Sequence, residues 1–186
     1  MEVEDWCPPS PMRVIAGRLK GRRLGAATWA GLRPTSDKLR ETLFNILAPR
    51  IAGARVLDGY AGTGAVGIEA LSRGADRVTF VDADHRAAAL IARNLAACGV
   101  EADYTIERDD VVSVLGRTAS AGFDLILLDP PYDLANTEAA LDAGARALAP
   151  GGLLVLERAT RREPVVPPPL VRIRDVKSGD STLTLL

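Results

Sequence analysis

The 186-residue sequence is poor in cysteine and histidine, the residues that most often bind metals or act as nucleophile and base. Its two cysteines, Cys7 and Cys98, are isolated and far apart, and neither belongs to a metal-type cluster. His85 is the single histidine; it has no partner for nucleophilic or metal chemistry and is expected to cap a helix or face solvent. We therefore expect no metal site and two reduced thiols, as in the cytoplasm.

Long apolar runs and a signal sequence are also missing. No uninterrupted apolar stretch approaches the ~20 residues that a membrane span needs. The N-terminus carries Glu2, Glu4 and Asp5, whereas a secretory signal begins with basic residues and an apolar stretch. With 47% hydrophobic and 25% charged residues, the chain is expected to form one domain with its own core and a small appendage, and to be a monomer.

The charge is small overall but unevenly placed. The net charge is −1, yet the segment from Arg13 to Arg40 holds eight basic residues and one acid, Asp37. From Glu41 onward there are 15 basic and 20 acidic residues. A basic segment on an acidic body predicts contact with a polyanion such as nucleic acid; the plainer alternative is a solvated edge whose charge prevents aggregation. The candidate nucleic-acid-binding residues are Arg13, Arg18, Lys20, Arg22, Arg23, Arg33, Lys38 and Arg40.

The first part of the chain divides into three short stretches. Residues 1–11 are rich in proline and lack periodicity, which predicts a disordered extension. Residues 12–34 contain two strand-like runs around "GRLKG", which predict a basic hairpin appendage. A helix is predicted to begin near residues 35–37, to bury a stripe of leucine and isoleucine side chains, and to end at Pro49.

After this helix, strand and helix patterns alternate regularly. Strands are predicted near 54–58, 77–82, 103–107, 123–129 and 152–157, with helices near 65–74, 85–98, 110–119 and 136–148 between them. Two last strands, near 171–176 and 181–186, follow a proline-rich linker and are expected to form a hairpin. The pattern predicts an α/β fold with a doubly wound, mostly parallel sheet, helices on both faces and one antiparallel edge. Ligands bind outside the carboxyl ends of the strands in such sheets.

A glycine loop follows the first of these strands. "LDGYAGTGAVG" holds Gly62, Gly64 and Gly67 in a G-x-G-x-x-G pattern, and Asp82 lies 20 residues beyond Gly62. This satisfies the dinucleotide fingerprint, so a nicotinamide-dependent oxidoreductase has to be considered. Asp58 argues against it, because a carboxylate at the end of the preceding strand would repel the pyrophosphate of a dinucleotide. The ammonium and sulfonium groups of S-adenosylmethionine would instead be attracted.

The neighbouring strand ends supply further acceptors for this cofactor. Asp82 is placed to accept from the ribose hydroxyls, and Asp110 from the adenine amino group, although Asp110 could instead be a helix N-cap. The predicted cofactor-binding residues are Asp58, Gly59, Tyr60, Ala61, Gly62, Gly64, Asp82, Ala83, Asp110 and Val111.

The stretch "DLILLDPPYD", residues 124–133, predicts a second functional element. Its apolar run is typical of a strand buried on both faces, and the two prolines after Asp129 have no N–H for a sheet ladder, so the strand must end there. The result is a rigid platform with one carboxylate, exposed backbone carbonyls and an aromatic ring, which suits a planar hydrogen-bond donor. The predicted catalytic residues are Asp129, Pro130, Pro131 and Tyr132.

These motifs together resemble a known family. "VLDGYAGTGAVGIEALSRGA" with "LLDPPY" resembles the class I methyltransferases of exocyclic nucleobase amines, and "RPTSDKLRETLFN" before them resembles the RsmD-type branch, which methylates guanine N2 in 16S rRNA. The resemblance runs from Met12 to about Glu157. It implies a seven-stranded sheet, S-adenosylmethionine as methyl donor, residues 35–186 as the methyltransferase domain, and 16S rRNA or the small ribosomal subunit as partner. Ser178 departs from the pattern, since a tyrosine before Gly179 is common in this group and would serve base stacking.

Within this resemblance the platform has a chemical role. The exocyclic nitrogen of guanine is a poor nucleophile because its lone pair is conjugated with the ring. Asp129 is expected to accept one of its hydrogens and the Pro130 carbonyl the other, so that the lone pair points at the sulfonium methyl, while Tyr132 stacks on the purine. The target must lie in a loop or be flipped out, and the basic segment would hold the surrounding phosphates.

Three other functions remain open from the sequence. A DNA adenine-N6 methyltransferase would use the same platform, although little chain remains for a separate DNA-reading domain. A nicotinamide oxidoreductase needs a proton relay at the fourth strand, which Asp129 between apolar residues and proline provides poorly. A non-catalytic RNA-binding module would tolerate the loss of Asp129.

Overall fold

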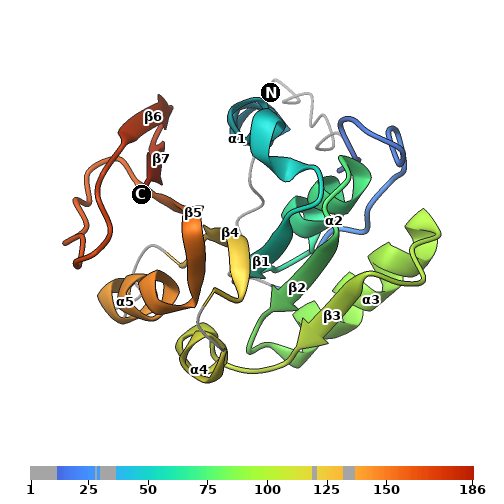
Figure 1. The fold of residues 1–186 in the computed structure, drawn as a ribbon. Coiled ribbons are helices and arrows are strands. Elements are labelled where there is room, and N and C mark those ends of the chain that lie inside the picture. The colour runs from blue at the N-terminus through green and yellow to red at the C-terminus, as the bar shows by residue number, and fades with distance from the viewer. Residues whose placement is uncertain (1–11, 28, 30–36, 119–120, 132–136) are drawn as a thin grey trace, which may run out of the picture.

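The computed structural model describes residues 12–27, 29, 37–118, 121–131 and 137–186, and every structural statement below concerns these residues. They form one sheet with helices packed against it, as Figure 1 shows. The strands are β1 (Arg55–Gly59), β2 (Arg77–Val81), β3 (Tyr104–Glu107), β4 (Phe123–Leu128), β5 (Leu148–Ala159), β6 (Arg174–Ser178) and β7 (Ser181–Leu185). The helices are α1 (Asp37–Ile51), α2 (Ala65–Ser72), α3 (His85–Cys98), α4 (Val111–Arg117) and α5 (Thr137–Ala147). The predicted disordered extension, 1–11, lies outside the described residues.

The sheet has seven strands in the order β3-β2-β1-β4-β5-β7-β6. Strands β1 to β5 run parallel, and β7 lies antiparallel between β5 and β6. This confirms the predicted doubly wound sheet, its closing hairpin and its antiparallel edge. The strand order reverses between β1 and β4, and in sheets of this kind ligands bind at the carboxyl ends beside that point.

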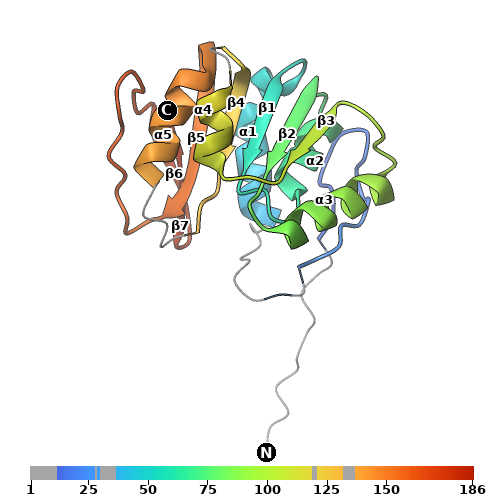
Figure 2. The same ribbon diagram turned by 90° about the horizontal axis from the view of Figure 1, so that it is seen from below.

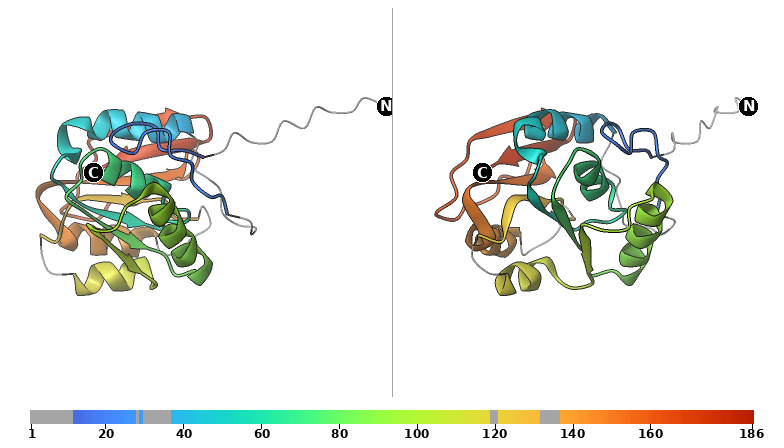
Figure 3. Two further views of the ribbon diagram at one scale, coloured as in Figure 1. Left: turned by 90° about the vertical axis from the view of Figure 1, so that its right-hand side faces the viewer. Right: turned by 45° about the vertical axis from the view of Figure 1, so that its right-hand side comes forward.

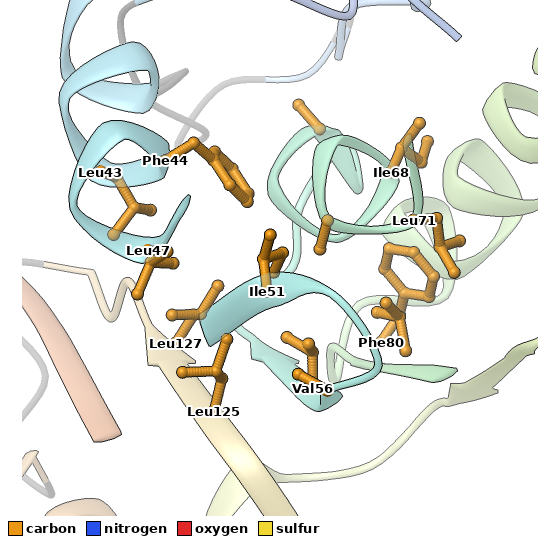
Figure 4. Close-up of a cluster of buried hydrophobic side chains, with 14 of the residues drawn as sticks. Leu43, Phe44, Leu47, Ile51, Val56, Ile68, Leu71, Phe80, Leu125 and Leu127 are labelled. Atoms are coloured by element: carbon orange, nitrogen blue, oxygen red, sulfur yellow. The ribbon is translucent and has the colours of Figure 1, made fainter. Parts of the chain in front are cut away.

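The helices cover both faces of the sheet. Helices α1, α2 and α3 lie on one face, and α4 and α5 on the other (Figure 2, Figure 3). Side chains of β4 alternate between two cores: Leu125 and Leu127 pack with α1 and α2, whereas Ile126 and Leu128 pack with α4 and α5. Figure 4 shows the first core, in which Phe44 of α1 lies beside α2 above the sheet. Burial on both faces is the reason that the middle strands are continuously apolar.

Helix α1 extends past the proline that was predicted to end it. Pro49 lies inside the last turn, and the helix continues to Ile51. The missing proline N–H removes one bond to the carbonyl four residues earlier, a smaller loss in a last turn than in a helix interior. Ile51 is 4% exposed and packs in the core between α1 and the sheet, which offsets that loss. The predicted helix end is therefore wrong by one turn or less.

Two further boundaries differ from the prediction. Strand β5 begins at Leu148, earlier than the predicted 152–157, because Leu148 already pairs with Phe123 of β4 before a shift of register. Leu148, predicted as the last residue of the helix over 136–148, is therefore the first residue of β5. Strand β6 begins later than predicted, at Arg174, where pairing with β7 starts.

The predicted basic hairpin is a turn closed by one antiparallel bridge rather than by two strands. Arg13 bridges Arg23, and the Val14 N–H donates to the Arg22 carbonyl at 3.0 Å. Other backbone groups of this segment bond to side chains of α2 and α3 instead of extending a ladder, which is why regular strands do not form. Residues 12–25 are called the basic loop below.

Candidate functional site

Three acidic residues come together at the carboxyl ends of neighbouring parallel strands. Asp58 lies near the end of β1, and Asp82 and Asp129 directly follow β2 and β4. Backbone bonds fix the loops that leave these strands. The Ala61 N–H donates to the last carbonyl of β2 at 3.0 Å, and the Asp129 N–H donates to the Gly59 carbonyl at 3.3 Å. The glycine loop is thus bonded to β2, and the Asp129 platform is bonded to β1.

The glycine loop requires glycine at two positions for different reasons. Gly64 caps α2 with φ 76°, in the left-handed region that other residues rarely adopt. Gly67 lies where an added Cβ would come 2.2 Å from the Phe80 ring, so that α2 can pack directly on β2. Tyr60 also has a positive φ, 62°, which is uncommon for a residue other than glycine and marks a strained turn at the end of β1.

Asp58 is a buried carboxyl group with an unusual pKa. It is 4% exposed, and one of its oxygens accepts a hydrogen bond from the Gly67 N–H at 2.8 Å. Burial raises the pKa of Asp58 from 3.8 to about 7; the Gly67 bond opposes this rise and the charge of Asp82 adds to it. A buried carboxyl group of this kind gains its charge most easily when a cation lies beside it.

Asp82 holds the glycine loop to the turn after β2. One of its carboxylate oxygens accepts from the Gly62 N–H at 2.8 Å, and the other from the Asp84 N–H at 2.9 Å. Each oxygen of a carboxylate can accept more than one hydrogen bond, so the side chain keeps acceptor capacity. Ala83, beside it, is exposed. The arrangement leaves Asp82 half-buried between two loops, both at the ligand-binding edge of the sheet.

A further acidic residue, Asp110, lies near the buried hydroxyl group of Tyr60. Asp110 caps α4 by accepting from the Ser113 N–H at 3.0 Å, and Val111 after it is 1% exposed. The Tyr60 hydroxyl is buried and has no hydrogen-bond partner among the described residues. Burial and the nearby charge of Asp110 raise the pKa of Tyr60 to about 12, so the hydroxyl stays protonated and can donate. Because buried hydroxyls normally have partners, this one is suited to a ligand.

The Asp129 platform borders two cavities. Asp129 is half-buried, Pro130 is buried and Pro131 is exposed, while Tyr132 lies outside the described residues. A small cavity under α1 is lined by Asp58, Asp129 and Glu157, together with apolar side chains of α1 and the sheet. A second cavity, of about 210 Å³, is lined by the two prolines, by the start of α5, and by Leu156, Glu157, Arg158, Ala159, Arg162, Glu163 and Pro164. The platform therefore lies between the small cavity near Asp58 and the larger cavity beside the last residues of β5.

Among the described residues, no three or more histidine, cysteine or acidic side chains are grouped as metal ligands. Within the same part of the chain, no helix has both the length and the apolar character to span a membrane.

Comparison with known proteins identifies the family. Residues 12–186 match the family described as conserved hypothetical protein 95. The chain is 34% identical over 172 residues to ribosomal RNA small subunit methyltransferase D of Haemophilus influenzae, covering 90% of this chain and 89% of that protein. A solved structure from Escherichia coli, yhhF, described as a methyltransferase, gives a TM-score of 0.81 at 31% identity, covering 94% of this chain and 96% of that one. The chain belongs to this family.

The predicted RsmD-type membership and class I fold are thereby confirmed, and the protein is an S-adenosylmethionine-dependent methyltransferase. A more distant structure, SMU.776, described as a methyltransferase in complex with SAH, shares the fold at 17% identity with a TM-score of 0.65, covering 78% of this chain and 48% of that one. The nicotinamide oxidoreductase and the non-catalytic binding module considered from the sequence are excluded.

In this methyltransferase most of the predicted nucleic-acid-binding side chains are exposed, but Arg40 is not. Arg40 is completely buried and donates to the Arg13 carbonyl at 2.7 Å and to Asp37 at 2.8 Å. A buried guanidinium cannot meet a phosphate at the surface, so the prediction that Arg40 contacts nucleic acid does not fit. Arg33 lies outside the described residues. The exposed members of the set are Arg13, Arg18, Lys20, Arg22, Arg23 and Lys38.

The basic loop is bonded to helix α2 through two buried polar side chains that the sequence reading did not single out. Glu69 accepts from the Ile15 N–H at 2.7 Å and from the Ala16 N–H at 2.9 Å. The Ser72 hydroxyl accepts from the Leu19 N–H at 2.9 Å. Both side chains are at most 3% exposed. A glutamate in the otherwise apolar run "AVGIEALS" was the sequence signal for this contact.

A third side chain connects the basic loop to the glycine loop. Asn94 of α3 is 2% exposed; its amide oxygen accepts from the Gly25 N–H at 2.7 Å. Its amide nitrogen donates to the carbonyl of Thr63, in the glycine loop, at 2.8 Å. Asn94 stands on the buried, otherwise apolar stripe of α3, and a polar residue on such a stripe predicts a buried hydrogen bond. The charged surface and the cofactor loop thus share one rigid support.

Proposed function

We propose that this methyltransferase transfers a methyl group to the exocyclic N2 amino group of a guanine in small-subunit ribosomal RNA. The observation that carries the proposal is the position of Asp129 and Pro130 at the end of β4, beside the point where the strand order reverses and one strand away from the buried carboxyl group of Asp58. The name of the Haemophilus influenzae relative supports ribosomal RNA of the small subunit as the substrate.

The residues at the strand ends fit S-adenosylmethionine. The buried Asp58 carboxyl lies where a cation would stabilise its charged form, and the buried Tyr60 hydroxyl lacks a partner among the described residues. Asp58 would hold the cationic methionine end, Asp82 the ribose hydroxyls, and Asp110 with Tyr60 the adenine end. Gly59, Ala61, Gly62, Gly64, Ala83 and Val111 would form the backbone and apolar walls.

The Asp129 platform would hold the acceptor. When bound, S-adenosylmethionine supplies a methyl group on a cationic sulfur, so the N–C bond forms as the C–S bond breaks and its electron pair returns to sulfur. Asp129 accepts one hydrogen of the guanine amine and the Pro130 carbonyl the other, which aims the nitrogen lone pair at the methyl group. Positive charge then develops on nitrogen, and the carboxylate stabilises it and takes up the released proton. Tyr132, outside the described residues, is proposed to stack on the purine.

The basic loop would bind the RNA backbone. Six exposed cations, five of them in a loop bonded to α2 and α3, form a cationic surface whose backbone is already ordered. Phosphate contacts of this kind make binding salt-sensitive and position the RNA without reading its sequence. Such a substrate, together with the free thiol of Cys98, supports a cytoplasmic location. A monomer is sufficient, since the proposed groups come from one chain.

The product of the reaction tests the proposal. The protein is incubated with labelled S-adenosylmethionine and small ribosomal subunits, naked rRNA or DNA, and the nucleic acid is digested for mass spectrometry of the nucleosides. We expect N2-methylguanosine from ribosomal substrate. N6-methyladenine from DNA would establish the adenine-N6 methyltransferase considered from the sequence, and absence of product on every substrate would reject both functions.

A further inference from the structure

Glu157 lies in the last paired stretch of β5, two residues before the strand ends at Ala159, and next to β4, which Asp129 directly follows. Strands β4 and β5 are parallel, and Leu128 pairs with Leu156. Asp129 and Glu157 are the next residue on each strand, so they stand at one level of the sheet. Neighbouring strands are about 4.8 Å apart, which places two carboxylates side by side at roughly that spacing.

The two side chains also face the same side of the sheet. Leu127 and Val155, two residues before them on their strands, both belong to the core under α1, and alternation returns Asp129 and Glu157 to that face. Consistent with this, both line the small cavity that also contains Asp58. Glu157 in addition lines the cavity of about 210 Å³ beside Pro130 and Pro131. It therefore stands where the proposed acceptor amine meets an open space.

The edge of guanine next to its N2 amine carries a second donor. N1–H is adjacent to the amino group, so guanine presents two neighbouring N–H groups, whereas the ring nitrogen next to the N6 amine of adenine is an acceptor. Carboxylates accept hydrogen bonds but do not donate them when ionised. A second carboxylate beside Asp129 therefore suits guanine and repels adenine.

We propose that Glu157 accepts the N1–H of the target guanine and so determines specificity for guanine over adenine. The proposal rests on the guanine-N2 function above and adds to it a residue that recognises the base. The third group on the guanine edge, the O6 acceptor, matches the exposed Arg162, which lines the same cavity. Glu157 lines both cavities, Asp129 the small one and Arg162 the larger one. Together they offer two acceptors and a donor to an edge that presents two donors and an acceptor.

A base analogue tests this contact. In 2,6-diaminopurine the N2 amine remains, but N1 loses its hydrogen and becomes an acceptor, and an amine replaces O6; comparison with a Glu157 variant therefore separates the N1 contact from the O6 contact. The target guanosine is located by mass spectrometry of oligonucleotide fragments. It is then replaced by the 2,6-diaminopurine nucleoside in an otherwise identical RNA, and kcat/KM is measured on both substrates. The wild-type protein is expected to prefer guanine by about 10²–10³, because the analogue would set an acceptor against the half-buried carboxylate of Glu157.

The Glu157→Gln variant should lose this preference. A glutamine amide can accept from guanine N1–H or, after rotation, donate to the N1 acceptor of the analogue. We expect the preference for guanine to fall to within about tenfold, with unchanged affinity for S-adenosylmethionine. Glu101→Gln, which removes an exposed carboxylate before β3 at the opposite edge of the sheet, is the matched control and should keep the wild-type preference.

The outcomes separate this inference from the function on which it rests. If the wild-type protein methylates guanine N2 but Glu157→Gln retains the wild-type preference, the role of Glu157 is wrong and the function stands. If the wild-type protein accepts both bases equally, the N1–H contact does not exist. Absence of N2-methylguanosine in the wild-type reaction would instead remove the function itself.

Discussion

At the scale of single residues, the protonation of Asp58 is the clearest link between structure and cofactor binding. Its folded pKa of about 7 lies above its ordinary value of 3.8, so the folded protein binds a proton more tightly than the unfolded chain does. The stability that this proton provides is present below pH 3.8 and is lost as the pH rises through about 7. A cationic ligand beside Asp58 reverses this preference for the protonated form, because the positive charge stabilises the ionised carboxylate.

Affinity for S-adenosylmethionine is therefore expected to fall as the pH drops below about 7. Below that pH the ligand has to displace a proton, which costs up to about tenfold in affinity per pH unit. Titration calorimetry in buffers of different ionisation heat would detect the released proton. Asp58→Asn should bind weakly with little dependence on pH in this range. An affinity of the wild-type protein that stays constant on both sides of pH 7 would contradict the role given to Asp58.

The burial of Arg40 could not be predicted from the charge of its segment. Charge density in the segment predicted a phosphate contact, and charge density cannot distinguish an exposed arginine from one enclosed between helices. Asp37, three residues earlier, and the Arg13 carbonyl both accept from the Nη2 of Arg40 in the fold. Burial lowers the pKa of Arg40, and the charges of Asp37 and Glu69 oppose that shift. The nearby acid in the sequence was a signal for an internal ion pair.

At the scale of secondary-structure elements, the basic loop depends on helix α2. Backbone amides of the loop donate to the carboxylate of Glu69 and to the hydroxyl of Ser72. One antiparallel bridge, between Arg13 and Arg23, joins the two ends of the loop. A loop held in this way presents its cations on an ordered backbone, which lowers the entropy lost when RNA binds.

Glu69→Gln is expected to loosen the loop. Glutamine has one acceptor oxygen in place of two, so either Ile15 or Ala16 loses its partner, at a cost of roughly 1–3 kcal/mol in the free energy of unfolding. Urea denaturation measures that loss, and amide hydrogen exchange should quicken at Ile15 and Ala16. Glu41→Gln, at an exposed position of α1, is the control and should change neither quantity. Equal effects of both substitutions would mean that Glu69 does not anchor the loop.

The elements themselves were largely predictable, because strand and helix periods differ and both faces of the middle strands are buried. The β–α alternation fixed the sheet, the closing hairpin and the position of each acidic residue at a strand end. A buried hydrogen bond at Glu69 and at Asn94 is signalled by a polar residue among apolar ones, but the partners were not predictable, since each bond joins segments more than 50 residues apart. The end of α1 was missed for a related reason: core packing of Ile51 outweighs the local effect of Pro49.

At the scale of the whole molecule, the basic loop and strand β6 lie on different sides of the sheet. The basic loop lies beside α2 and α3, whereas the strand order places β6 at the far edge of the sheet (Figure 1). RNA bound through the loop would approach the carboxyl ends of the strands from one side, leaving the β6 edge without phosphate contacts.

Replacing Arg22 and Arg23 by glutamine is expected to weaken RNA binding and to reduce its dependence on salt. Each lost phosphate contact lowers the slope of log affinity against log salt by about 0.7–0.9, so the double variant should lose up to about 1.8. Filter binding at several salt concentrations gives the slope. Lys177→Gln, on β6, should leave it unchanged. If Lys177→Gln lowers the salt slope as much as the double variant does, the RNA does not bind specifically through the basic loop.

The central claim is that cofactor and acceptor are held by different carboxyl groups at adjacent strand ends. It is tested most directly by measuring methyl transfer and cofactor affinity together in Asp129→Ala. We predict wild-type affinity for S-adenosylmethionine and a single-turnover rate reduced by about 10²–10³, because one preorganised electrostatic partner of the amine is lost. A rate within a few-fold of wild type, or a loss of cofactor affinity as large as the loss of rate, would contradict the account.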